Sequence, residues 1–138
     1  MRDWMKQLVA EVTAWPGVTS HAHRFGGVEF RLGTREIGHA HSFGIVDIPF
    51  TKRIRDALIR TDRAEQHHWL PDSGWTTVHA GAEEYANALQ LLRLSYLRIQ
   101  LRSPDVSQAE QSSAELHSFG LDPDLLAAIA PAESALHS

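Results

Sequence analysis

Apolar and polar residues alternate between Gly26 and Phe50, and this alternation constrains the fold more than any other feature of the sequence. A period of two is typical of a β-strand, because successive side chains point to opposite faces of a sheet. Two short segments that each contain a glycine, 33–35 and 42–44, interrupt the alternation. The pattern therefore predicts a three-stranded antiparallel meander, with strands over about 26–32, 36–41 and 45–50.

The lengths of the two turns determine which residues share a face of this meander. If both turns have three residues, Leu32 lies opposite Glu36, and Ala40 lies between Val28 and Val46. One face then carries apolar side chains around the small residues Gly38 and Ala40, namely Val28, Phe30, Leu32, Val46, Ile48 and Phe50. Because small residues allow a close approach, this face is expected to carry a packed helix.

The opposite face of the meander collects ionisable residues. Glu29, His39 and Asp47 form one cross-strand row, and His41 lies beside it. A two-residue first turn would instead place both histidines among apolar side chains, at a cost of about 1–3 kcal/mol for each unpaired polar group. We therefore expect the three-residue register, with the histidines on a polar face.

The residue types on this polar face suit three kinds of site. Imidazole ligates transition metals, and His39, His41 and Asp47 resemble the two-histidine, one-carboxylate set that binds divalent transition metals in open sites. The face could also be a solvated polar surface, with His39 hydrogen-bonded to Glu29 or Asp47. A third interpretation is a metal-free binding or acid–base site, in which a carboxylate orients an imidazole. The sequence leaves all three open.

A second group of strands is predicted after a short helix. Thr51 is a good N-cap for a helix over 52–61. Residues 65–70 and 75–79 then flank the turn tetrapeptide Pro-Asp-Ser-Gly at 71–74, which predicts a hairpin with a four-residue loop. In that hairpin His68 and His79 share one face, so both join the candidate ligand-binding residues.

Helical periodicity marks both ends of the predicted sheet. A first helix is expected to follow Asp3, and the longest covers 83–101. The apolar stripe of the long helix is wide, which indicates cover on more than one side, by the C-terminal tail or by a second subunit in a homodimer. The elements predict a single α+β domain over 1–102, an antiparallel sheet (meander plus hairpin) with helices packed on one face, and a partly helical tail over 103–138.

Composition limits the classes of function. The chain has 138 residues and no cysteine, which excludes disulfides, thiol catalysis and cysteine-ligated zinc. It has no signal-peptide pattern and no run near the roughly 20 apolar residues that span a bilayer, so we expect a cytoplasmic protein without a membrane partner. The net charge of −4 gives no general attraction to nucleic acid, although basic residues cluster locally at Lys52, Arg53, Arg55, Arg60 and Arg63.

Several ordered motifs lie between Trp15 and Arg98. They are Trp15-Pro16-Gly17-Val18, Phe25-Gly26-Gly27-Val28-Glu29-Phe30, Arg35-Glu36-Ile37-Gly38-His39-Ala40-His41, Asp47-Ile48-Pro49-Phe50, His67-His68, Pro71-Asp72-Ser73-Gly74-Trp75 and Leu91-Leu92-Arg93-Leu94-Ser95-Tyr96. This set resembles the bacterial luciferase-domain family of small proteins, with a family-like core of about 15–100. The resemblance implies no catalytic residues, and light emission does not follow from the family's name.

The second half, with its Trp-containing hairpin and Leu-rich helix, also resembles the MmcQ/YjbR double-wing group. That similarity implies an antiparallel sheet with helices on one face, and makes nucleic-acid binding conceivable. Three functions follow. The first is a non-catalytic binding or interaction module, self-associating, that uses the histidine–carboxylate face. The second is a small metal- or His-dependent enzyme at the same face, and the third is a nucleic-acid binder using Lys52, Arg53 and Arg55. The sequence leaves open whether the chain is an enzyme.

Overall fold

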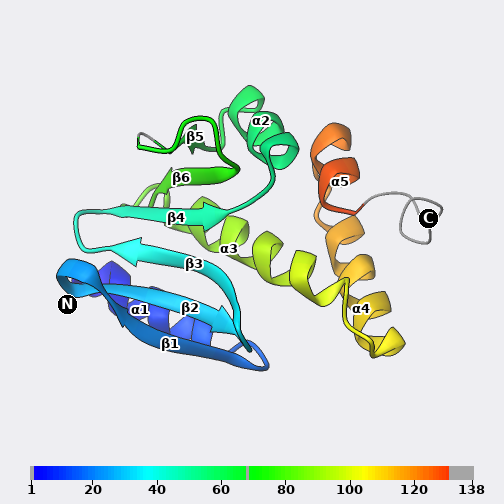
Figure 1. Cartoon of the computed structure of the whole chain (residues 1–138), viewed down its shortest axis with the longest axis horizontal. Coiled ribbons are helices and arrows are strands. Elements are labelled where there is room, and N and C mark those ends of the chain that lie inside the picture. Colours follow the sequence, from blue (N-terminus) through cyan, green and yellow to red (C-terminus); the bar gives the residue numbers. More distant parts are fainter. Residues whose placement is uncertain (1, 68, 131–138) are drawn as a thin grey trace.

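The computed structural model describes residues 2–67 and 69–130. Within these residues the chain forms an antiparallel sheet in the order β1-β2-β3-β4-β6-β5 together with five helices, which confirms the α+β class (Figure 1). The strands are β1 (Val18–His23), β2 (Gly27–Leu32), β3 (Arg35–His41), β4 (Ile45–Pro49), β5 (Glu65–Gln66) and β6 (Trp75–His79). The helices are α1 (Asp3–Thr13), α2 (Lys52–Arg60), α3 (Tyr85–Gln100), α4 (Val106–Ser118) and α5 (Pro123–Ile129).

The predicted meander corresponds to β2, β3 and β4, and its central register is confirmed. Val28 pairs with Ala40, which in turn pairs with Val46. The prediction that Leu32 lies opposite Glu36 is wrong, because the register shifts between residues 30 and 31 and Leu32 pairs with Arg35. The first turn therefore has two residues, and the irregularity keeps the expected face assignment in the rest of the strand pair.

The sequence pattern missed the first strand, β1. It pairs with β2 over its whole length, from Val18 opposite Leu32 to His23 opposite Gly27. Val18 is its only buried residue, and the others are exposed or half-buried. An edge strand with so little burial has no alternation of apolar and polar residues, so periodicity could not identify it.

The predicted hairpin is only partly confirmed. Strand β6 has the expected bounds, but β5 contains two residues, and Glu65 pairs with Thr77. The connection therefore covers 67–74 in place of a four-residue loop. Its carbonyls at Pro71 and Ser73 accept hydrogen bonds from Arg55 Nη1 at 2.7 and 2.5 Å, so a side chain from α2 replaces strand pairing there. The expected position of His68 lies outside the described residues.

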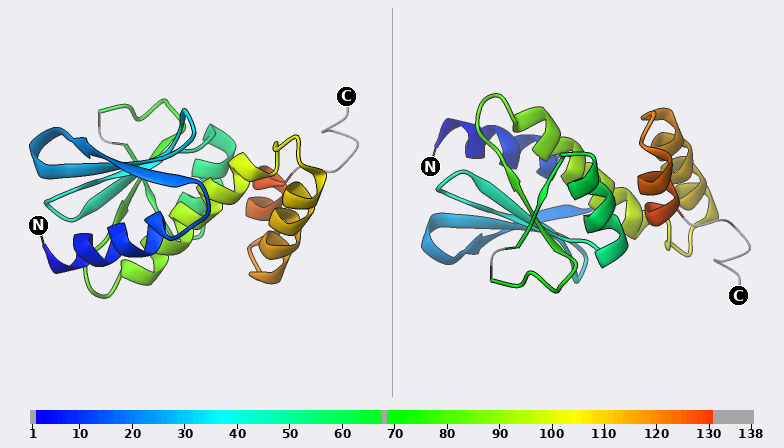
Figure 2. Two further views of the ribbon diagram at one scale, coloured as in Figure 1. Left: turned by 90° about the horizontal axis from the view of Figure 1, so that it is seen from below. Right: turned by 90° about the horizontal axis from the view of Figure 1, so that it is seen from above.

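Helices α1 and α3 lie side by side on one face of the sheet (Figure 2). A Cβ atom built on Gly38 would lie 2.8 Å from Leu92 Cδ2, so α3 does approach the sheet where the sequence has its small residues. Ser95 Oγ donates to the Ile37 carbonyl at 2.8 Å at the same contact. This packing leaves the other face of β3 free of these helices.

The C-terminal segment covers α3 and α2. Helix α4 packs on α3, where Arg93 donates to both carboxylate oxygens of Glu115 at 2.7 Å, and α5 packs on α2. Leu116, Leu125 and Ile129 are buried in the same core as the sheet residues. The tail is therefore one of the two alternative covers that the wide apolar stripe of α3 predicted, and homodimerisation remains a prediction. No helix in the described residues could cross a membrane.

Replacing Gly38 by alanine should destabilise the protein by about 1–3 kcal/mol, because the new methyl group would overlap Leu92 and the Asp47 carbonyl. The free energy of unfolding from chemical denaturation measures this cost. A double-mutant cycle with Leu92→Val, which removes the clashing atom, should recover part of it. An equal cost of Gly38→Ala in both backgrounds would show that close packing of α3 is not the cause.

A chain that ends after Arg102 should aggregate and melt at a lower temperature, because it loses the buried residues of α4 and α5 and exposes apolar surface on α3. A chain that ends after Ala130 retains both helices and is the matched control. Light scattering and thermal melting compare the two. If the shorter chain is monomeric and melts at the same temperature as the control, the first 102 residues are an independent domain.

Candidate histidine–carboxylate site

Strands β2, β3 and β4 place the predicted polar residues on the sheet face that lies opposite α1 and α3. His39 pairs with Glu29 on one side and with Asp47 on the other, as the register predicted. His41 follows two residues later on β3 and points to the same face. The site is therefore a consequence of the alternation along β3. Gly38 and Ala40 are buried against the helices, so His39 and His41 between and after them point to the other face.

Asp47 is the centre of this site, and it is only 1% exposed. Its Oδ2 atom accepts a hydrogen bond from His41 Nε2 at 2.8 Å, and the Nε2 atoms of His39 and His67 lie 3.4 and 3.5 Å from it. Its Oδ1 atom accepts from Thr77 Oγ1 at 2.6 Å. Three imidazole nitrogens therefore converge on one carboxylate oxygen. His67, which comes from the connection before β6, was part of a quoted motif but not of the predicted site.

His39 lies between two carboxylates. Its Nδ1 atom is 2.7 Å from Glu36 Oε2, while Nε2 faces Asp47. Burial lowers the pKa of His39, but the hydrogen bonds with Asp47 and Glu36 outweigh burial and raise it to about 9. Burial raises the pKa of Asp47, but hydrogen bonds from His39, Thr77 and His41 hold it well below its ordinary value. His39 is therefore an imidazolium and Asp47 a carboxylate at neutral pH.

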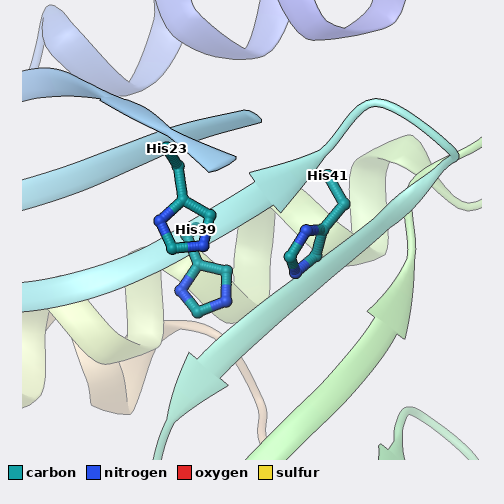
Figure 3. A group of neighbouring side chains, drawn as sticks. All are labelled: His23, His39 and His41. Atoms are coloured by element: carbon teal, nitrogen blue, oxygen red, sulfur yellow. The ribbon is translucent and has the colours of Figure 1, made fainter. Parts of the chain in front are cut away.

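His23 is a site residue that sequence reasoning missed. Its ring stacks on that of His39, with centroids 4.3 Å apart, and faces His41 at 5.6 Å (Figure 3). One ring nitrogen from each of these three histidines lies within 4.8 Å of the others. Burial lowers the pKa of His23, and so do the neighbouring His39 and His41, so this ring is neutral at pH 7. The one available signal was the spacing His21-Ala22-His23, which repeats that of residues 39–41.

A pocket of about 390 Å³ opens above the histidines. Its rim carries three aromatic side chains that are strongly exposed: Phe25 (92%), Phe43 (68%) and Trp69 (78%). Phe25 has a φ of 56°, a left-handed conformation that is costly for a bulky residue. Its carbonyl accepts from Ser42 Oγ at 3.3 Å, which ties the loop of Phe25 to the loop of Phe43. The pocket therefore combines a charged floor with an apolar rim.

The other predicted candidates lie at the edge of this site or outside it. Glu29 is beside His23, with its Oε1 atom 3.7 Å from Nδ1, and it also pairs with Arg31. His79 is on β6 but pairs with the exposed Glu65 at 3.5 Å and does not line the pocket. The structure therefore brings together His39, His41 and Asp47, which are the predicted metal ligands, and adds His23 and His67.

The donor set fits a divalent transition metal. Neutral imidazole nitrogen and carboxylate oxygen are the ligands that such ions prefer. The second ring nitrogen of a metal-bound histidine usually donates to a carboxylate, and the contact between His39 Nδ1 and Glu36 has this form. The same residues without a metal form an imidazolium–carboxylate pair that can transfer a proton.

The raised pKa of His39 predicts a pH dependence of stability in chelator-treated protein. Because the ring titrates at about 9 in the folded chain and at 6.5 as a model group, its contribution is complete below pH 6.5 and is lost as pH rises through 9. The free energy of unfolding should therefore fall more steeply over this range in wild type than in His39→Gln. Equal slopes would mean that His39 is not held as an imidazolium. The His39 Hε1 resonance gives an independent titration.

Comparison with known proteins adds one positive finding. The Luciferase domain model matches residues 34–95, a stretch that runs from the turn before β3 into α3. It contains His39, His41, Asp47 and His67, whereas His23 precedes it. No curated protein and no solved structure matches the chain significantly. Residues 34–95, which supply most of the histidine–carboxylate site, are thus similar to the Luciferase domain. The resemblance to the luciferase-domain family that the sequence motifs predicted is confirmed.

Proposed function

We propose that this protein is a small-molecule-binding module whose site holds a divalent transition-metal ion between His39, His41 and Asp47. The observation that carries the proposal is the convergence of three imidazole Nε2 atoms on Asp47 Oδ2, at 2.8 to 3.5 Å. An isolated structural histidine needs one hydrogen-bond partner. Several imidazoles around one buried carboxylate can together ligate a metal ion, once the protons in the imidazole–carboxylate hydrogen bonds are released.

The surrounding residues support a metal position at this point. Glu36 holds Nδ1 of His39 and so orients Nε2 toward Asp47. Thr77 donates to Oδ1 of Asp47 and leaves Oδ2 for the imidazoles or an ion. Three protein ligands leave coordination positions for water or a ligand, as in metal sites that bind small molecules. His23 and His67 are within reach as a further ligand.

The pocket indicates the kind of small molecule. A ligand of the proposed class carries a donor atom, such as a carboxylate or phenolate oxygen, that would meet the metal at the charged floor. Its apolar or aromatic body would lie among Phe25, Phe43 and Trp69. Exposed aromatic side chains cost free energy in water, and an apolar ligand that covers them regains it.

Metal titration of tag-free protein tests this proposal. Isothermal calorimetry with Zn²⁺ or Ni²⁺ should show one equivalent bound to wild type, proton release at neutral pH because His39 must lose a proton, and a rise in melting temperature. His39→Ala and His41→Ala should each remove the binding. His79→Ala is the matched control, because His79 pairs with Glu65 outside the pocket, and it should bind as wild type does.

Two results would contradict the metal proposal. One is the absence of binding to wild type, and the other is equal binding by His39→Ala and wild type. The first result would favour a second candidate, a metal-free acid–base site in which carboxylates orient the His39 imidazolium for proton transfer. The specific observation for that candidate is that both ring nitrogens of His39 already face carboxylates.

A further inference from the structure

A second pocket, separate from the histidine–carboxylate site, is lined by residues of α2, α5 and the C-terminal end of α3 and by the residues that flank these helices. Figure 1 shows where these helices lie in the fold. Its volume is about 290 Å³. Three of its residues are arginines, Arg53 from α2, Arg98 from α3 and Arg102 just beyond α3. Its other residues are Thr51, Leu101, Ala128 and Ile129. It shares no lining residue with the histidine–carboxylate site.

Within the described residues, these arginines lack the side-chain partners that other arginines on the nearby helices have. Arg60 pairs with Asp122 at 2.6 Å, and Arg93 pairs with Glu115 at 2.7 Å. Over 2–67 and 69–130, no hydrogen bond or ion pair joins Arg53, Arg98 or Arg102 to another side chain. None of the described residues that line this pocket carries a carboxylate. Three arginines therefore line a hollow in which no described residue supplies a compensating negative charge.

Arg98 shows the electrostatic cost of this arrangement. Arg98 also lines an adjoining hollow of about 280 Å³ together with Arg35 and Glu36. The carboxylate of Glu36 is paired with His39, with Oε2 2.7 Å from Nδ1. Burial lowers the pKa of Arg98, and so do the nearby charges of Arg102 and Arg35. Arg98 is half-buried, whereas Arg53 and Arg102 are exposed. Like charges repel one another most strongly where one of them is partly removed from water, and an anion beside Arg98 would offset that repulsion.

We propose that Arg53, Arg98 and Arg102 bind the phosphate group of a small phosphorylated molecule. Guanidinium groups donate pairs of parallel hydrogen bonds that match phosphate oxygens, and three of them suit a dianion better than a single carboxylate. The Thr51 hydroxyl accepts from Ile54 N at 3.2 Å and keeps its own proton for donation to the ligand. Leu101, Ala128 and Ile129 provide an apolar wall for the rest of the molecule. This site is additional to the proposed metal site and does not depend on it.

Pyrophosphate binding to the full chain tests the proposal. At fixed ionic strength, calorimetry should show one site for pyrophosphate on wild type, and affinity should fall by about tenfold or more in Arg98→Gln and in Arg53→Gln, since each loses charge-assisted hydrogen bonds. Lys52→Gln is the matched control. It removes one charge beside Arg53, but Lys52 does not line the pocket, and its affinity should stay within about threefold of wild type.

A second readout separates binding from a structural role. Without pyrophosphate, Arg98→Gln should melt at the same temperature as wild type or higher, because it relieves repulsion from Arg102 and Arg35. No pyrophosphate binding to wild type, or an equal loss in Lys52→Gln and Arg98→Gln, would overturn the proposal. A short DNA duplex that binds more tightly than pyrophosphate, with a loss in Lys52→Gln, would overturn it in favour of nucleic-acid binding.

Discussion

The rest of the site depends on the hydrogen bonds and ion pairs that surround the buried carboxylate of Asp47. A charge removed from water is tolerated only when hydrogen bonds and opposite charges surround it. Asp47 meets this requirement through His41 and Thr77, with His39 and His67 close by. These partners come from β3, from β6 and from the connection between β5 and β6, so one carboxylate links three segments on this face of the sheet.

The two faces of the sheet are coupled through β3. Gly38 and Ala40 let α3 pack closely, and the same pleat directs His39 and His41 to the other side. The helices thus fix the strand that carries the two histidines without contributing a side chain to the pocket. A rigid strand on a packed helical layer is a suitable support for ligands that must keep a defined separation.

Much of this arrangement could be predicted from the sequence because it depends on local alternation. The pairing of His39 with Glu29 and Asp47 needed only the register in which Val28, Phe30 and Val46 face the core. His23 could not be found in that way, because β1 is an edge strand with one buried residue and its position depends on tertiary pairing. The long connection before β6 likewise depends on Arg55, a contact from another element that no local pattern contains.

Long-range ¹H–¹⁵N NMR of the imidazole rings during zinc titration tests most directly whether the Nε2 atoms of His39 and His41 are metal ligands, as proposed. Metal binding at the proposed position should move the ¹⁵N shifts of these two Nε2 atoms to metal-bound values at one equivalent of zinc. The rings of His79 and His117, which do not line the pocket, should be unchanged. Unchanged shifts at His39 and His41, or changes confined to His79 and His117, would contradict the account.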